Sequence, residues 1–211
     1  MPFSSSVELL VLHAVRIKGM ADAETVSGRF ALDRADVQEQ LLDYEASGLV
    51  QRVEFAEVRG WSMTGAGRDE DERLLAAELE NASARDVVTA SHAAFLPLNV
   101  RFLEAITRWQ LRPAPWDRMA PNDHRDWRWD ERVLGELTSL SARLKRIEEG
   151  LSGTLTRFGG YGGRFDAALA HVDQGRRSWV DEPKIDSCHT VWFELHEDLL
   201  ATLGLERGAG V

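Results

Sequence analysis

The segment from Leu41 to Arg68 constrains the fold more than any other part of the chain. It joins the end of an apolar helical run, closed by Ser47-Gly48, to the extended pair Leu49-Val50 and then to a return strand that ends in Thr-Gly-Ala-Gly-Arg at residues 64–68. Glycine just beyond a helical run is a stop signal, and a short return strand after an extended stretch indicates a hairpin. The segment therefore predicts a helix followed by a two-stranded hairpin.

Three helices are expected ahead of this hairpin. Ser4–Ser6 can cap a first helix that ends at Lys18-Gly19, and a second helix spans about residues 22–30. The Leu32-Asp33 pair makes the turn into a third helix, because aspartate is a favoured N-cap residue. The candidate core residues of that third helix are Val37, Leu41, Leu42 and Tyr44.

The hairpin segment resembles the MarR and PadR type bacterial regulators, whose sequences run L-x-x-L-E-x-x-G-L-V-x-R, then a wing, then L-T-x-x-G-R. The matching residues are Leu41, Glu45, Gly48, Leu49, Val50, Arg52, Thr64, Gly67 and Arg68. Tyr44 takes the second Leu position and Met63 replaces the Leu before the Thr. The resemblance covers about residues 5–80 and implies a winged helix-turn-helix that binds double-stranded operator DNA.

The third helix of such a fold enters the major groove with its first exposed side chains, here Arg34, Gln38 and Gln40. Arg34 suits a guanine edge and Gln38 an adenine edge, because each can form a bidentate pair with the base. In the wing, Arg52 and Arg59 are placed to contact phosphate or the minor groove, and Trp61 to pack beneath it. Arg52 could equally pair with a neighbouring carboxylate.

The charge balance favours an alternative partner. The chain has a net charge of −10, and residues 1–68 carry seven Lys or Arg against ten Asp or Glu. DNA affinity comes largely from cations that neutralise phosphates. The acidic side chains on the surfaces that DNA would meet are Asp33, Asp36, Glu39, Glu54 and Glu57. They are consistent with a second hypothesis, a winged-helix adaptor that docks a protein.

The rest of the chain predicts helices without strands. Helices are expected at Arg85–Leu96 and Leu98–Leu111, separated by Pro97, followed by a loop over 112–122 that holds three prolines. A long helix over about 130–151, a glycine-rich turn at 158–165, a helix to Gln174 and a last helix ending at Gly204 complete the pattern. The predicted fold is mainly α, with a winged domain at 1–81 and an α-helical dimerisation and effector-binding domain at 82–211.

Six of the seven tryptophans lie in this second half, which is consistent with an aromatic pocket for a small-molecule effector. Ordinary aromatic packing of a small core is the alternative. The candidate ligand-binding residues are Trp109, Asp123, His124, Trp127, Tyr161, His189, Trp192 and His196.

The sequence gives little support for a metal site, a reactive cysteine or an enzyme active site. His189 and His196 are about 10 Å apart along a helix at 1.5 Å per residue, too far to share one metal ion, so neither a metal nor a cofactor is predicted. Cys188 is the single cysteine, which excludes an intramolecular disulfide; beside His189 it is either a reactive thiol or an inert buried one. No spacing supports an enzyme, and no signal peptide or membrane span is found. The leading hypothesis is a cytoplasmic, homodimeric transcriptional regulator.

Overall fold

The computed structural model describes residues 1–55 and 58–205, so Glu57 of the wing lies outside the described residues. The described chain is mainly helical, as predicted, with a single two-stranded sheet. It forms two compact units. The first unit holds Met1–Val88, Ser152–Arg157 and the chain from Glu194 onward; the second holds Thr89–Leu151 and Phe158–Phe193. None of the described helices is both long enough and apolar enough to cross a membrane.

Three short helices open the first unit, namely α1 (Val7–Lys18), α2 (Ala23–Phe30) and α3 (Arg34–Ala46). Each begins at a side-chain cap that accepts a hydrogen bond from an otherwise unpaired backbone N–H. The Ser6 hydroxyl accepts from Leu9 N, and the carboxylates of Asp22 and Asp33 do the same for α2 and α3. The expected helix starts are confirmed.

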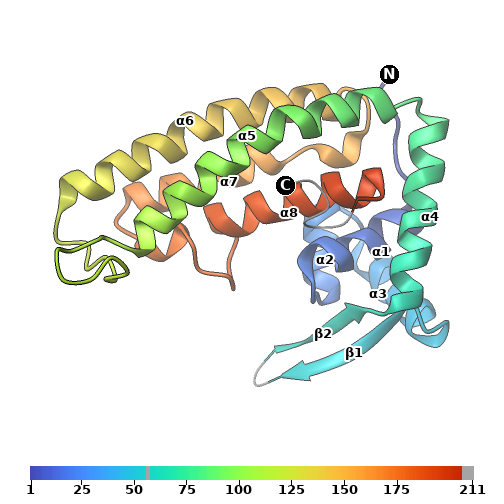
Figure 1. Ribbon diagram of the computed structural model, residues 1–211. Helices are drawn as coiled ribbons and strands as arrows, with labels where there is room; N and C mark the ends of the chain where they lie inside the picture. The colour runs from blue at the N-terminus through green and yellow to red at the C-terminus, as the bar shows by residue number, and fades with distance from the viewer. Residues whose placement is uncertain (56–57, 206–211) are drawn as a thin grey trace. The chain divides into compact units, whose positions relative to one another are not determined.

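The hairpin follows α3 as predicted. Strand β1 (Val50–Phe55) pairs antiparallel with β2 (Val58–Met63), and Arg52 lies opposite Trp61. Trp61 also exchanges both backbone hydrogen bonds with Ala21, which ties the hairpin to the turn before α2. Figure 1 shows three helices followed by a projecting hairpin, an arrangement consistent with a winged helix.

A compact apolar core joins these elements. It is built mainly from α1, α2 and α3, with Val50 and Trp61 from the hairpin; its buried members are Val11, Leu12, Ala14, Val15, Ala21, Ala23, Val26, Val37, Leu41, Tyr44, Val50 and Trp61. Packing of Trp61 beneath the wing is confirmed. The prediction for Leu42 is wrong, because its position turns it outward and leaves it 43% exposed.

Helix α4 (Gly65–Asn81) starts directly at the end of the hairpin. Thr64 caps it by accepting from Gly67 N at 3.1 Å. A Cβ at position 67 would lie 1.9 Å from the carbonyl oxygen of Leu49, so only glycine fits this close approach of two backbones. The Thr-Gly-Ala-Gly sequence thus ends the wing and begins a helix.

The first unit also includes segments from much later in the chain. Phe3 donates from its backbone to Thr154 O at 2.8 Å and accepts from Thr156 N at 3.0 Å, just where η1 (Thr156–Phe158) begins. The C-terminal half of α8 (Cys188–Leu203) belongs to the same unit. The predicted boundary at residue 82 instead assigned both segments to the second domain.

Helices α5 (Arg85–Gln110) and α6 (Trp127–Ser152) form most of the second unit and run alongside each other (Figure 1). The expected break at Pro97 is wrong, because α5 continues through it. Pro97 is exposed, so water can satisfy the carbonyl that the proline leaves unpaired, while Phe95 and Leu98 are buried on either side. Tertiary packing therefore holds the helix together across the proline.

Helix α7 (Tyr161–Asp173) and the short turn η2 (Arg177–Trp179) complete the second unit with the first residues of α8. Helix α6, predicted over about 130–151, buries one apolar face that includes Leu137, Leu140 and Leu144. Between α5 and α6 the chain forms a closed loop, in which Arg112 N donates to Ala120 O at 2.9 Å.

Candidate functional site

Helix α3 presents the side chains that the sequence predicted to read DNA bases. Arg34 is its first residue and is 70% exposed, directly after the Asp33 cap. Gln38 and Gln40 are half-buried farther along the helix. The N-terminal end of α3 thus offers one accessible guanidinium, and Arg34 is the single basic side chain between Asp33 and Ala46.

The surface around Arg34 is acidic. Glu24 of α2 lies 3.8 Å from Arg34 Nη1, and Asp36 and Glu39 are exposed on α3 itself. Exposed ion pairs of this kind contribute about 0–1 kcal/mol, so phosphate or a base edge can displace Glu24. The local field nevertheless opposes an approaching polyanion.

The two wing arginines are also paired. Arg52 Nε donates to both carboxylate oxygens of Glu45, at 3.0 and 2.9 Å, and its guanidinium lies 5.3 Å from the Trp61 ring centroid. The hydrogen bond from Arg52 lowers the pKa of Glu45. Arg59 donates to Glu54 at 2.8 Å across the hairpin. All three candidate DNA-contacting arginines therefore have a carboxylate beside them.

A cluster of buried charges lies at the centre of the first unit. The buried ion cluster consists of His13 and Arg16 from α1, Asp71 and Glu78 from α4, Arg157 from η1 and Asp198 from α8. Each of these side chains is at most 8% exposed. With His13 protonated, three cations face three anions, which is the balance a buried charge cluster needs.

His13 stands between two carboxylates of this cluster. Its Nδ1 is 3.3 Å from Asp71 and its Nε2 is 3.1 Å from Asp198. Burial opposes the charged imidazole, but Asp71 and Asp198 outweigh it and raise the pKa of His13 to about 9. Burial likewise opposes the Asp198 carboxylate, and the nearby charges of Arg157 and His13 lower its pKa below the ordinary range.

Arg157 binds two carboxylates of the cluster and one hydroxyl outside it. Its Nε donates to Glu78 at 2.7 Å and its Nη2 to the Thr202 hydroxyl at 2.7 Å, while Nη1 bonds Asp198. This cluster was not predicted from the sequence. The available signal was that His13 and Arg16 interrupt the apolar stretch Leu9–Ile17 of α1, where charged side chains need buried partners.

The residues predicted to bind an effector fall into separate groups. Trp192 is fully buried in an aromatic cluster, stacked on Phe102 at 4.5 Å and on Phe95 at 4.9 Å, and its Nε1 donates to Asn99 at 3.0 Å. Tyr161 is also fully buried in the second unit. These contacts fit aromatic core packing, which was the alternative interpretation.

A second group anchors the base of the loop between α5 and α6. The His124 ring lies 4.4 Å from that of buried Trp109, and His124 Nδ1 is 3.0 Å from Asp130. Asn122 donates to Trp109 O and to Asp130, each at 3.0 Å. This polar group is therefore satisfied internally. Asp123 and Trp127, the other candidates here, are exposed.

The C-terminal candidates divide between the units. His189 lies in the second unit, 4.4 Å from the ring of Phe193, whereas His196 belongs to the first unit. Cys188 is fully buried, and burial raises the pKa of its thiol to about 12, so the structure offers no activation of this sulfur. Within residues 1–55 and 58–205, no three His, Cys, Asp or Glu side chains are grouped as metal ligands.

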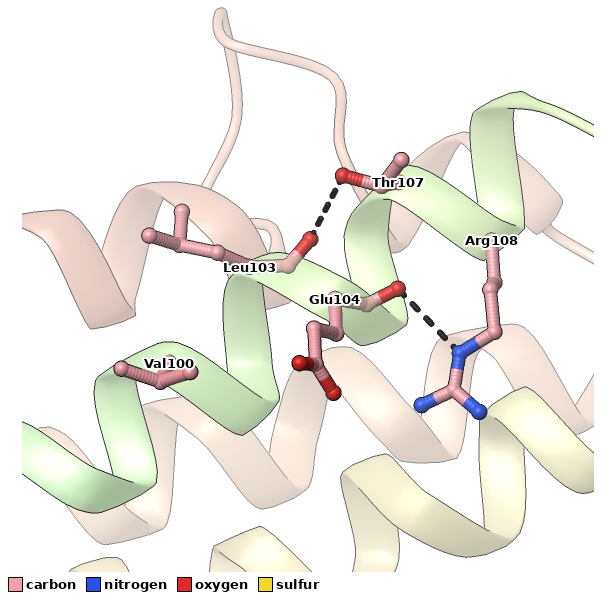
Figure 2. Close-up of a pocket in the computed structure, with 5 residues that line it drawn as sticks. All are labelled: Val100, Leu103, Glu104, Thr107 and Arg108. Atoms are coloured by element: carbon pink, nitrogen blue, oxygen red, sulfur yellow. Dashed lines mark hydrogen bonds between the residues drawn. The ribbon is translucent and has the colours of Figure 1, made fainter.

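A pocket lies along α5, and none of the predicted ligand residues lines it. Figure 2 shows its lining of Val100, Leu103, Glu104, Thr107 and Arg108. Thr107 donates to Leu103 O at 2.8 Å and Arg108 Nε to Glu104 O at 3.3 Å, so the polar side chains turn back onto their own helix. Val100 and Leu103 supply the apolar lining, and the Glu104 carboxylate adds a negative charge.

Comparison of the chain with protein-family models, with curated proteins and with solved structures found no match.

Proposed function

We propose that this chain is a DNA-binding transcriptional regulator whose second, helical unit dimerises and receives a small-molecule effector. The observation that carries the proposal is the order of elements in the first unit. Three capped helices precede a hairpin, and the third helix offers Arg34 at its exposed N-terminal end. In helix-turn-helix proteins this end of the third helix reads base edges, and two-fold symmetry places two such helices about one DNA turn apart.

The test is enrichment of genomic fragments by the purified protein at about 50 mM salt, where phosphate contacts are strongest. The expected result is an inverted repeat with half-sites about 10 base pairs apart. Arg34→Ala is expected to weaken binding to that repeat by about 1–3 kcal/mol. Arg73→Ala is the matched control, since Arg73 is an exposed, carboxylate-paired arginine on α4. Equal losses in both variants would argue against readout by α3.

A second candidate, a winged-helix adaptor for a basic protein partner, is favoured by the charges on the same surface. Residues 1–80 carry 8 basic and 16 acidic side chains. Arg34, Arg52 and Arg59 each lie beside a carboxylate.

The two candidates predict opposite effects of one double substitution, Asp36→Asn with Glu39→Gln. Removing two exposed negative charges from α3 raises affinity for DNA, because it reduces repulsion of phosphate. The same change lowers affinity for a basic protein. Absence of DNA enrichment, together with weaker capture of a protein partner by this variant, would establish the adaptor.

A further inference from the structure

The loop between α5 and α6 exposes large apolar side chains. Trp116 is 85% exposed and Met119 67%, and Trp127, the first residue of α6, is 63% exposed. Other exposed apolar side chains of the second unit, such as Val100 at 58%, are less accessible. An indole in water loses the favourable free energy of burying its large apolar surface. Exposed apolar side chains of this size mark interaction surfaces. This segment is therefore a candidate interaction surface.

The loop that carries Trp116 and Met119 is held by its own backbone. Leu111 forms a bridge with Pro121, and Asn122 N donates to Gln110 O at 2.8 Å. Ala114 and Asp117 exchange hydrogen bonds of 2.8 and 3.1 Å. A surface already fixed in shape loses little conformational freedom on binding, so the apolar side chains are pre-organised for contact.

The charges around these side chains define the partner's chemistry. The loop carboxylates are engaged locally: Asp117 accepts from Met119 N at 2.8 Å, and Asp123 accepts from Arg125 N at 3.1 Å. The guanidinium of exposed Arg128 lies 5.2 Å from the Trp127 ring centroid, and Arg118 is exposed in the loop itself. Tryptophan, methionine and arginine are the residue types enriched where protein interfaces are buried. An apolar centre with arginines beside it suits an acidic surface.

Helix α3 of the same chain is such a surface. Leu42 is 43% exposed there, and Asp36, Glu39 and Asp43 are exposed around it. We infer that this face of α3 in one copy binds the Trp116, Met119 and Trp127 surface of a second copy. Arg118 and Arg128 would then meet the carboxylates of α3, whereas pairing of two identical loops would bring arginines opposite one another.

Each copy carries both surfaces, so two copies can exchange this contact reciprocally. The association covers the exposed face of α3 and therefore competes with any macromolecule that this face binds. This self-association goes beyond the proposed function. It does not depend on DNA binding, because it can be measured with the protein alone.

Sedimentation equilibrium of the full chain at about 50 and about 500 mM salt tests the contact, since screening weakens charge pairing. A dimer is expected that dissociates more readily at the higher salt. Trp116→Ala with Met119→Ala is expected to weaken it at least about tenfold, a loss of about 1.4 kcal/mol. Val100→Ala with Leu103→Ala, which removes exposed apolar groups from the α5 pocket, is the matched control and should leave the dimer unchanged.

Charge reversal then identifies the partner surfaces. Glu39→Lys with Asp43→Lys, and separately Arg118→Glu with Arg128→Glu, should each give folded monomers by circular dichroism. Their mixture should dimerise, because each reversed surface meets a complementary one. Dimers in either variant alone, or none in the mixture, would overturn the inference. A wild-type chain that stays monomeric but sediments with phosphatidylserine vesicles through Trp116 would assign the loop to a membrane surface instead.

Discussion

The buried ion cluster makes the stability of the first unit depend on the proton of His13. The pKa of this imidazole rises from its ordinary value of 6.5 to about 9 on folding. The shift corresponds to about 3 kcal/mol of stabilisation by the charged form. Because the folded pKa is the higher one, this stabilisation is complete below pH 6.5, decreases as the pH rises and is lost above about pH 9.

The perturbation we choose is His13→Asn. Asparagine cannot carry a positive charge between Asp71 and Asp198, so the variant leaves excess negative charge in a fully buried site. Removing one partner of a buried charge pair costs about 3–5 kcal/mol. Urea denaturation from pH 6 to pH 10 should show that loss at pH 6, together with a flattened pH dependence between pH 6.5 and 9.

Peptide-level hydrogen exchange on α1 and α4 measures the stability of the first unit apart from that of the second, because local opening reports local stability. His171→Asn is the control, since His171 belongs to the second unit and has no place in the cluster. A wild-type unfolding free energy that stays constant from pH 7 to pH 10 would refute the reasoning. So would a loss in His13→Asn no larger than in the control.

Three further changes test other parts of the structure. Gly67→Ala should destabilise the first unit by about 1–3 kcal/mol in urea denaturation, because its methyl group would overlap the Leu49 carbonyl; unchanged stability would mean that α4 can move away from the hairpin. Asn122→Ala should speed hydrogen exchange throughout the loop between α5 and α6, since it removes the donor to Asp130 and Trp109; unaltered exchange would show that the loop is anchored elsewhere. Cys188 should react with a thiol reagent at pH 8 only after unfolding, because burial raises the pKa of its thiol to about 12; rapid labelling of the folded protein would contradict this.

Local signals predicted much of the first unit correctly. Ser6, Asp22 and Asp33 act as helix caps through contacts within three residues, and the Thr64 to Gly67 turn is equally local. Such signals are readable because the hydrogen bond that each residue makes is fixed by its neighbours in the chain. The wing was predictable for the same reason.

Features that depend on distant segments were not predictable in this way. Pro97 indicated a helix break, yet buried side chains on both sides of it hold α5 together. The buried ion cluster joins α1 to Arg157 and Asp198. No local pattern predicts which residue pairs with which when the partners are so far apart in the sequence. Of the predicted ligand residues, Trp192 and Tyr161 are fully buried, because aromatic content alone does not distinguish a pocket from a core.

The return of η1 and the end of α8 to the first unit has a consequence for synthesis on the ribosome. Helix α1 is made before η1 and α8, yet Asp198, which faces His13, and Arg157, which pairs with Glu78 of α4, come from those later segments. Until then His13 has Asp71 but not its second carboxylate, Asp198, and Glu78 lacks the guanidinium that balances its charge in the buried site. The winged portion of the chain must therefore wait for the helical portion before it reaches full stability, and a fragment cut after α4 should not behave as a portable module.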